Sequence, residues 1–350
     1  MSKKRTVFFY MKNKREFIEV EDVDINKSAK IKLDLILSTY SVPNWIKEKW
    51  EDVYLCNNSG NVDKAKSLYI KSIDSTYDLT NKLNDLTSKE WLPETVTVFT
   101  QKGLGAGNKN AQIEKQHPAP FSYQDIMRLI KFYSKEGDKV LDPFSGVGST
   151  VKACAFENRI GYGIELNPKY HELAIERINI EVPDEMKFKN NQNFINSDCI
   201  TCIKKIENDL FDFIVTSPPY WNILETVDHK SNERLKDNLD VKYSDNSDDL
   251  GNISDYDEFL DILSTFFDDC SRVLKKGKYL AIIVSDFRKK EKFHIFHADL
   301  ANKIESKGNF KLKGIKILYQ RHKSIYPYGY PFTFVPNIHH QNVLIFENKK

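Results

Sequence analysis

A strand, a tight glycine turn and a helix follow one another in residues 138–156, and this order constrains the fold more than any other segment. Residues 138–141 form a short apolar run, residues 142–150 read Asp-Pro-Phe-Ser-Gly-Val-Gly-Ser-Thr, and residues 151–156 suit a helix. Glycines at such a turn allow positive φ and let a ligand approach the backbone closely. The arrangement is typical of parallel α/β sheets, which bind nucleotide-like ligands at the carboxyl ends of their strands.

The turn differs from the dinucleotide-binding pattern Gly-x-Gly-x-x-Gly, because the third glycine is missing and an acid, Asp142, precedes the turn. A carboxylate at this place suits a cationic group, such as the ammonium of an amino acid, better than it suits a pyrophosphate. We therefore expect a nucleotide-like ligand that carries a positive charge. A nicotinamide-dependent dehydrogenase on the same kind of sheet is disfavoured for the same reason.

Four apolar runs each end in a polar side chain, at spacings of 23, 33 and 19 residues: Asp142, Glu165, Asp198 and Ser217. The carboxyl ends of parallel strands meet at one edge of a sheet, so these side chains are expected to line one site. Glu165 falls 19 positions after Gly146, about where an acid of such folds binds ribose hydroxyls. Asp198 can accept a hydrogen bond from an adenine amino group. One such acid alone is usually a helix cap or a surface group, but four in order indicate a ligand site.

The fourth run leads into residues 216–221, which read Thr-Ser-Pro-Pro-Tyr-Trp. Two prolines fix φ at about −65° and hold the preceding residue extended, so the chain is rigid and its carbonyls can face a pocket. Ser217 adds a hydroxyl, and Tyr220 and Trp221 add aromatic rings. Hydrogen-bond acceptors beside a stacking surface are what a flipped nucleobase with an exocyclic amino group requires. For the string alone, the alternative is a plain turn or a proline-rich ligand for a partner protein.

Together, residues 142–150 and the Ser-Pro-Pro-Tyr string resemble the cofactor and catalytic motifs of the DNA amino-methyltransferases, which methylate adenine N6 or cytosine N4. The resemblance spans residues 114–347. It implies an α/β, Rossmann-like fold with a mostly parallel seven-stranded sheet and helices on both faces. It also implies S-adenosylmethionine as the cofactor and double-stranded DNA as the partner. Residues 117–121 resemble the segment that lies over the methionine end of the cofactor in that family.

The resemblance assigns roles to individual residues. The catalytic residues that it implies are Ser217, Pro218, Pro219 and Tyr220. The cofactor-binding residues that it implies are His117, Pro118, Phe121, Asp142, Pro143, Phe144, Gly146, Gly148, Thr150, Glu165 and Asp198. In the expected mechanism the flipped base stacks on Tyr220, Ser217 and the Pro218 carbonyl accept its amino hydrogens, and methyl transfer is direct.

The cysteines and the serine at the head of the motif narrow the expected reaction. None of the five cysteines follows a proline, so covalent carbon-5 methylation of cytosine is not expected. In the family that the chain resembles, Ser before Pro-Pro-Tyr is typical of cytosine-N4 enzymes, whereas Asp or Asn marks adenine-N6 enzymes. We therefore predict a site-specific DNA methyltransferase that acts on cytosine N4, within a restriction-modification system or a phage or host defence. Adenine-N6 methylation of DNA is the alternative, and methylation of an RNA base lies further from the pattern.

Charge is distributed unevenly along the chain. The net charge of +2 gives no overall field that would attract nucleic acid. Residues 272–350 nevertheless hold 17 Lys and Arg against 5 Asp and Glu, which predicts a surface that faces phosphates. Residues 222–258 hold 4 against 11, and we expect them to form a mobile, solvated acidic insert.

The chain is expected to divide into an N-terminal α+β region, residues 1–95, and a methyltransferase catalytic domain, residues 96–350. In the N-terminal region, residues 31–37 suit a strand and residues 62–86 suit a helix. The sequence shows no recognition domain after the last expected strand. Recognition of the DNA target is therefore assigned to residues 1–95, to the acidic insert, or to both.

Two later segments of the catalytic domain carry structural predictions of their own. Residues 256–274 are amphipathic and suit a helix, with Gly277 as its C-cap. Residues 332–336 and 342–346 are expected to close the sheet. Both predictions rest on local pattern alone, without a motif.

The remaining expectations concern compartment, metals and partners. An odd number of cysteines with no leader and no membrane run favours a reducing cytoplasm, in a prokaryote or encoded by a phage. No metal site is expected, because Cys199 and Cys202 form a solitary pair and His339 and His340 have no acid partner in the sequence. A cognate restriction endonuclease is a candidate partner, and the sequence does not fix the oligomeric state.

Overall fold

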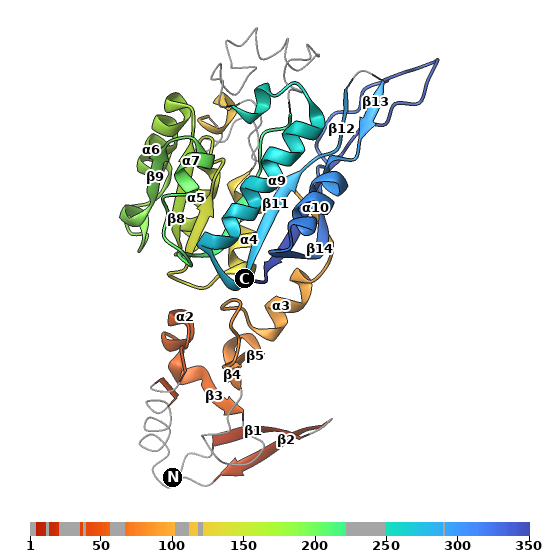
Figure 1. Cartoon of the computed structure of the whole chain (residues 1–350). Helices are drawn as coiled ribbons and strands as arrows, with labels where there is room; N and C mark the ends of the chain where they lie inside the picture. Colours follow the sequence, from red (N-terminus) through yellow and green to blue (C-terminus); the bar gives the residue numbers. More distant parts are fainter. Residues whose placement is uncertain are drawn as a thin grey trace. The chain divides into compact units, whose positions relative to one another are not determined.

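The computed structural model describes residues 5–11, 14–20, 36–37, 40–56, 67–101, 112–117, 122–221, 249–289 and 291–350 (Figure 1). Its contacts divide the chain into two compact units, Met1–Thr95 and Val96–Lys350. Residues 118–121, residues 31–35 of the expected first strand, and residues 222–248 of the acidic insert lie outside the described residues. No helix in the described ranges combines the length and the apolar character needed to cross a membrane.

The first unit is built from small antiparallel sheets and short helices. One sheet is the hairpin of β1 (Arg5–Met11) and β2 (Lys14–Val20). The other is a meander of three strands, β3 (Val53–Cys56), β4 (Ser67–Ile70) and β5 (Ser75–Asp78). The helices are α2 (Asn44–Lys47) and α3 (Ser88–Glu94).

The prediction of a helix over residues 62–86 was wrong, because β4 and β5 lie there. A 3-10 turn at Lys71–Ile73 and a left-handed Asp74, with φ of 47°, reverse the chain between the two strands. The strands bury alternate apolar side chains in a core that belongs to this unit alone. Its buried members are Ile36, Val42, Ile46, Val53, Leu68, Ile70, Tyr77 and Leu79.

The second unit contains an eight-stranded sheet in the order β6-β14-β15-β11-β10-β7-β8-β9. The strands are β6 (Val98–Thr100), β7 (Lys139–Asp142), β8 (Ile160–Glu165), β9 (Asn193–Asn196), β10 (Phe211–Thr216), β11 (Leu274–Val284), β14 (Phe310–Tyr319) and β15 (His340–Asn348). Among these eight, β15 alone runs against its neighbours, β11 and β14. The mostly parallel α/β sheet is therefore confirmed. It has one strand more than expected, because β6 adds to β14 at the edge.

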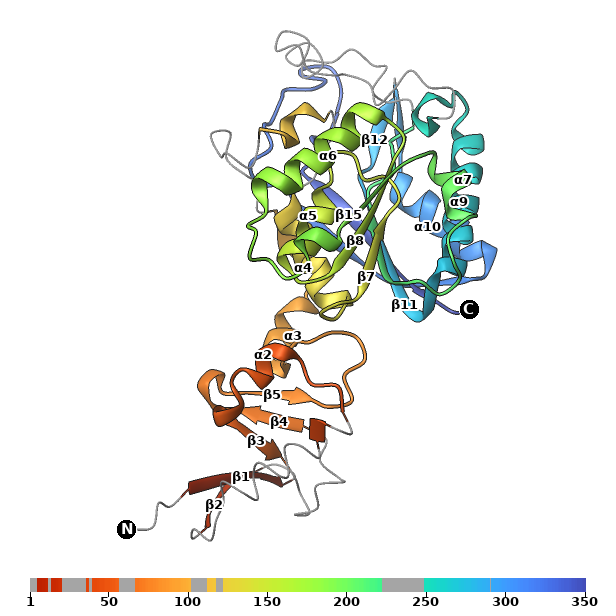
Figure 2. The same cartoon turned by 90° about the vertical axis from the view of Figure 1, so that its left-hand side faces the viewer.

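Helices cover both faces of this sheet, as Figure 2 shows, with α4, α5 and α6 on one face and α7, α9 and α10 on the other. They are α4 (Tyr123–Tyr133), α5 (Ser149–Phe156), α6 (Pro168–Glu181), α7 (Cys199–Ile203), α9 (Tyr256–Val273) and α10 (Phe296–Lys307). Side chains cap four of them in the usual way, because Ser122, Asn167, Asp198 and Asp255 each accept a backbone N–H of the first turn. The large core lies mainly between α9, α10 and the sheet.

The segment after α9 corrects a second prediction. Gly277 does not cap the helix, because α9 ends at Val273 and β11 begins at the next residue. Leu274 and Tyr279 are partners of Phe211 and Phe213, so β11 bulges between them, and Gly277 has a φ of 72°.

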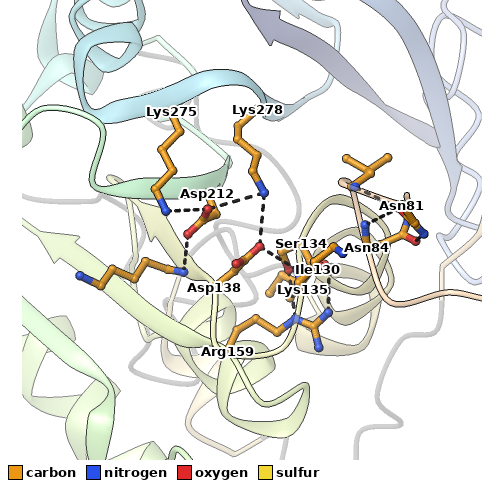
Figure 3. A network of polar contacts seen from close by, with 12 residues as sticks. Asn81, Asn84, Ile130, Ser134, Lys135, Asp138, Arg159, Asp212, Lys275 and Lys278 are labelled. Atoms are coloured by element: carbon orange, nitrogen blue, oxygen red, sulfur yellow. Dashed lines mark hydrogen bonds and ion pairs between the residues drawn. The ribbon is translucent and has the colours of Figure 1, made fainter. Parts of the chain in front are cut away.

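Two lysines of the bulge, Lys275 and Lys278, form ion pairs with acids of the neighbouring strands (Figure 3). Lys275 Nζ lies 2.8 Å from Asp212 Oδ1, and Lys278 Nζ lies 3.5 Å from carboxylate oxygens of both Asp138 and Asp212. Burial raises the pKa of Asp138, and the Lys278 ammonium opposes that rise. The bulge thus brings two cations to a pair of partly buried acids at the amino-terminal ends of β7 and β10. If Gly277 capped the helix instead, Asp138 and Asp212 would lack these two lysines as partners.

Residues 332–336 do not join the sheet either. The last strand begins at His340, and residues 320–339 connect β14 to β15 without a strand of their own. Phe332 and Phe334 are 92% and 84% exposed, so this segment presents its apolar side chains to solvent.

Candidate active site

A cavity opens at the carboxyl ends of β7, β8, β9 and β10, which are adjacent in the sheet. Its volume of about 80 Å³ is smaller than that of typical small-molecule sites, roughly 300–1,000 Å³, so the case for a ligand site rests on the groups that line it. The lining residues are His117, Pro143, Phe144, Gly146, Ile164, Glu165, Leu166, Asn167, Tyr170, Ser197, Asp198, Cys199, Ser217, Pro219, Asp249 and Leu250. The strand ends that the sequence places in order therefore meet around one space.

The glycine turn between β7 and α5 forms one wall. Gly146 and Gly148 have φ values of 51° and 76°, which other residues adopt only with strain. A Cβ at Gly148 would lie 2.9 Å from the Cβ of Ala174, so the turn packs directly on α6. The ring of His117 lies over Gly146, with Nε2 3.1 Å from the place of a Cβ, and meets the Tyr170 ring edge-on at 4.9 Å. His117 is thus held against the turn.

Asp142 lies beneath this turn and does not reach the cavity. Its side chain is fully buried, and its oxygens accept the hydroxyls of Thr150 and Thr216 at 2.5 Å each and the N–H of Phe144 at 3.1 Å. Burial raises its pKa to about 6, and these three hydrogen bonds oppose the rise. In this structure Asp142 and Thr150 therefore tie β7, α5 and β10 together, instead of facing a ligand.

Glu165 joins the second strand end to the glycine turn. One carboxylate oxygen accepts the Gly146 N–H at 2.8 Å, and the other accepts the Asn167 N–H at 2.8 Å. Burial is the main cause that raises its pKa to about 7, with Asp142 and Asp249 adding to the rise and the two N–H groups opposing it. Each oxygen keeps a further lone pair that can accept from a ligand in the cavity.

Asp198 stands at the third strand end as the N-cap of α7. Its carboxylate accepts the N–H groups of Ile200 and Thr201 at 3.2 and 2.8 Å and the Thr201 hydroxyl at 2.7 Å. This is the helix-cap role that such an acid commonly has. It also lines the cavity, so the two roles coincide.

The fourth strand end carries the Ser-Pro-Pro-Tyr string. The Ser217 hydroxyl donates to the carbonyl of Ile283 on β11 at 3.0 Å, and its oxygen also meets the Tyr220 hydroxyl, so one oxygen lone pair stays available for a hydrogen-bond donor. Ser217 and Pro219 line the cavity. Tyr220 is not among the lining residues, and its hydroxyl accepts from Gln341 Nε2 at 3.1 Å. Burial raises the pKa of Tyr220, and hydrogen bonds with Gln341, Ser217 and the Ser285 backbone oppose the rise.

Trp221 anchors the end of the string away from the cavity. It has a φ of 27°, is 8% exposed and packs on the rings of Tyr256 and His294 at 5.2 and 5.4 Å. The ammonium of Lys289 lies 3.7 Å from the centre of the Trp221 ring. His294 and Lys289 belong to the hairpin of β12 (Phe287–Lys289) and β13 (Lys292–His294), so this hairpin fixes the strand end from outside.

The residues named from the sequence therefore fall into three groups. Those that line the cavity are His117, Pro143, Phe144, Gly146, Glu165, Asp198, Ser217 and Pro219. Those that lie next to it without lining it are Asp142, Gly148, Thr150, Pro218 and Tyr220. Pro118 and Phe121 lie outside the described residues. Among the described residues no cluster of His, Cys, Asp and Glu is close enough to hold a metal.

Sequence reasoning missed several residues at the site. Asp249 and Leu250 line the cavity and are each 7% exposed, and Asp249 accepts the Gly251 N–H at 2.8 Å. The expectation of a solvated insert was therefore wrong for residues 249–251, which are buried. Asp286 follows β11 and lies 2.7 Å from His297 Nδ1. Gln341, on β15, holds Tyr220. Nothing in the sequence near these residues forms a motif that could have marked them.

Fold and site together define a class of protein: a mostly parallel α/β protein in which a glycine turn and a Ser-Pro-Pro-Tyr strand end share one cavity. The chain belongs to the N6/N4 DNA methylase family, whose sequence profile matches residues 2–176 and 211–349. S-adenosylmethionine is the methyl donor of this family, and DNA is its substrate.

Individual relatives match shorter stretches. The Type II methyltransferase M.HpaI of Haemophilus parainfluenzae is 43% identical over 74 residues, which cover 21% of this chain and 23% of the relative. M.MthZI of Methanothermobacter thermautotrophicus is 37% identical over 92 residues, 26% of this chain and 24% of the relative. M.BglI of Bacillus subtilis is 30% identical over 138 residues, 39% and 36% of the two chains. The matches thus span between about a quarter and a third of these relatives.

Solved structures resemble the chain more remotely. A candidate DNA modification methylase from Thermus thermophilus has a TM-score of 0.30 and 20% identity, covering 43% of this chain and 50% of that one. A TehB-like S-adenosylmethionine-dependent methyltransferase from Corynebacterium glutamicum has a TM-score of 0.34 and 13% identity, covering 65% and 87%.

Proposed function

We propose that this chain is a site-specific DNA methyltransferase that transfers a methyl group from S-adenosylmethionine to the exocyclic amino group of a flipped base, with cytosine N4 as the favoured target. One observation carries the proposal. Ser217 lines the same cavity as Glu165 and the Gly146 turn, and its hydroxyl proton is engaged by the Ile283 carbonyl. An acceptor for an amino group therefore stands in the space where the cofactor would lie.

The residues of the cavity fit S-adenosylmethionine. Glu165 offers lone pairs to two ribose hydroxyls, and Ile164, Leu166 and Leu250 offer apolar walls to a purine. Asp198 would accept from the adenine amino group, and His117 with the Gly146 turn would border the methionine part. When bound, the cofactor supplies an electrophilic methyl group on a sulfonium.

The chain's own groups would orient and activate the base. An exocyclic amino nitrogen is a weak nucleophile because its lone pair is delocalised into the ring. Ser217 and the Pro218 carbonyl would accept its two hydrogens, which favours localisation of that lone pair and fixes its direction. The Gln341 bond to the Tyr220 hydroxyl holds the tyrosine in one position, so its ring can support the base once the base enters.

The choice of cytosine N4 rests on Ser217 as the residue before Pro-Pro-Tyr. A serine hydroxyl and an aspartate or asparagine oxygen can each accept one amino hydrogen, so adenine N6 is the alternative. Sequencing DNA from cells that express this chain, with a readout that separates 4-methylcytosine from 6-methyladenine, tests both. We expect 4-methylcytosine at a fixed sequence. 6-Methyladenine would overturn the choice of base while leaving amino methylation in place.

We also propose that residues 1–95 or the acidic insert, residues 222–258, read the target sequence. Residues 1–95 form a unit with its own core, as expected of a module that can vary independently of the catalytic sheet. The test is a chimera that carries residues 1–95 of a relative with a different target. A changed methylation site supports the N-terminal unit as the reader. An unchanged site would exclude it and leave the insert.

The Type II relatives support a place in a restriction-modification system, with a cognate endonuclease as a partner in the cell. The test is to challenge DNA from expressing cells with endonucleases that cleave the methylated sequence. We expect this DNA to resist cleavage and DNA from control cells to be cut. Equal cleavage of both would contradict a protective role.

A further inference from the structure

The connection between β14 and β15, residues 320–339, starts and ends at the edge of the sheet where the cavity opens. β14 runs parallel to β10, so its carboxyl end lies at the edge of the sheet where the cavity opens. At the other end of the connection, the His340 carbonyl accepts from Ser285 Oγ at 3.3 Å, and Gln341 donates to Tyr220. Figure 1 shows the connection, in blue-violet, projecting beyond the sheet at this edge. We call residues 320–339 the β14–β15 loop.

Hydrogen bonds give the β14–β15 loop a defined neck. Asn337 and Tyr326 exchange two bonds, with the Tyr326 N–H donating at 2.9 Å and Asn337 Nδ2 donating to the Tyr326 carbonyl at 2.8 Å. Lys323 Nζ donates to the Ile338 carbonyl at 2.8 Å. These bonds close the loop some distance from its tip.

The tip of the β14–β15 loop is a tight turn. Gly329 has a φ of 76°, and its carbonyl accepts the N–H groups of Phe332 and Thr333 at 2.7 and 2.8 Å. A Cβ at Gly329 would lie 2.3 Å from the Thr333 carbonyl oxygen, so the turn requires glycine. The chain therefore builds a specific shape at a place where its side chains bury little surface.

The side chains at this tip are large, apolar and exposed. Tyr330, Phe332 and Phe334 are 81%, 92% and 84% exposed, and Ile325, next to the neck, is 77% exposed. An ordered apolar group of this kind usually marks a binding surface, since a monomer gains nothing by exposing it. The sequence has no Asp or Glu between Glu305 and Glu347, so the loop and β14 carry only basic charge.

We propose that the β14–β15 loop is a DNA-contacting wedge, whose tip residues Phe332 and Phe334 insert beside the target base when that base leaves the helix. This inference rests on the proposed function. Aromatic rings inserted at a base step unstack it and cover the faces of the neighbouring bases. Arg321, at the base of the loop, would meet the phosphates. The absence of acids favours this polyanion over a second copy of the chain as the occupant.

The test compares methyl transfer to plasmid DNA by the wild-type chain and by the Phe332→Ala, Phe334→Ala double variant. We expect the KM for DNA to rise by at least about tenfold, because a ring that stacks on a base contributes that much to binding. Affinity for S-adenosylmethionine should not change. Two controls accompany it. Phe332→Trp with Phe334→Trp keeps the rings and should keep the KM, and Ile180→Ala, at a 68% exposed site on α6, should not alter it.

A second arm uses a duplex in which the methylated base stands opposite an abasic site, so that it is already unpaired. The double variant should regain most of its affinity for this duplex, because the target base is already unpaired and the wedge is not needed to displace it. An unchanged KM for plasmid DNA, or equal losses on paired and unpaired duplexes, would overturn the wedge and leave the proposed function standing. A double variant that changes the sedimentation mass of the protein while its DNA KM is unchanged would assign the loop to contact between copies instead. A wild-type chain that methylates no DNA would overturn the proposed function, and the wedge with it.

Discussion

The Ser217 hydroxyl is held by a backbone carbonyl, and this contact decides what its oxygen can do. Because the proton points to Ile283 and the Tyr220 hydroxyl takes one lone pair, the other lone pair remains for an amino group in the cavity. Ser217→Ala should lower kcat roughly 100-fold, as loss of one positioned polar group at a reacting centre does, while the Kd of S-adenosylmethionine stays constant. Single-turnover methylation and calorimetry check this. Ser285→Ala removes a hydroxyl that also donates to a backbone carbonyl, outside the cavity, and should behave as wild type.

Glu165 makes cofactor binding depend on pH. Its pKa is raised to about 7, so the carboxylate, which we propose accepts ribose hydroxyls, is mostly lost at pH 6 and mostly present at pH 8. Affinity for S-adenosylmethionine should therefore rise by about tenfold from pH 6 to pH 8. In Glu165→Gln the rise should be reduced to the part that Asp142 causes, which is mostly complete by pH 7 because its pKa is about 6. An equal rise in the variant would contradict this role.

The same shift has the opposite sign for stability of the ligand-free chain. The folded protein holds the Glu165 proton more tightly than the unfolded chain does. The stability that this group contributes is therefore complete below its ordinary pKa of 4.5 and is lost as the pH rises through about 7. As the pH rises through this range, the affinity for the cofactor should therefore increase while the free energy of unfolding of the ligand-free chain decreases.

At the scale of elements, two glycines with similar backbone conformation should respond differently to substitution. Gly277 in the β11 bulge and Gly148 before α5 have φ values of 72° and 76°. A Cβ at Gly277 meets nothing within 4 Å, so Gly277→Ala should cost only about 1–2 kcal/mol of unfolding free energy for the left-handed backbone. At Gly148 the Cβ would also collide with Ala174. Gly148→Ala should therefore cost more and weaken S-adenosylmethionine binding, as urea unfolding and calorimetry would show.

Much of the candidate site could be predicted because the residues that form it are consecutive in the sequence. The glycines at 146 and 148 and the prolines at 218 and 219 restrict the backbone where they stand, and each follows an apolar run. Gln341, Asp286 and Asp249 have no such local signature. They reach the site only because β15, β11 and the end of the insert are brought there by the sheet order.

The elements that were predicted wrongly failed for a related reason. Residues 62–86 carry enough apolar spacing for a helix, but strand pairing and a left-handed Asp74 decide their structure. Gly277 follows two lysines, as a glycine that caps a helix often does. Lys275 and Lys278 instead pair with Asp212 and Asp138, and the segment forms a bulge in β11. In both cases contacts from distant parts of the chain outweigh local preference.

At the scale of the whole molecule, the two units have separate cores, and the described residues that line the cavity belong to the second. A chain consisting of residues 96–350 should therefore fold and bind S-adenosylmethionine with the affinity of the full chain, while site-specific methylation of DNA is lost or changed. Thermal unfolding, calorimetry and sequencing of treated DNA check the three parts. Loss of cofactor binding in a folded fragment would show that the first unit completes the cavity.

The central claim is that Ser217 and its strand end direct a methyl group to an exocyclic amino nitrogen of DNA. The most direct measurement incubates the purified full chain with plasmid DNA and S-adenosylmethionine carrying an isotope-labelled methyl group, then digests the DNA and identifies the labelled nucleoside by mass spectrometry. We predict labelled 4-methylcytosine from the wild-type chain and a roughly 100-fold lower yield from Ser217→Ala at early times. Label in 5-methylcytosine, or in no nucleoside of DNA, would contradict it.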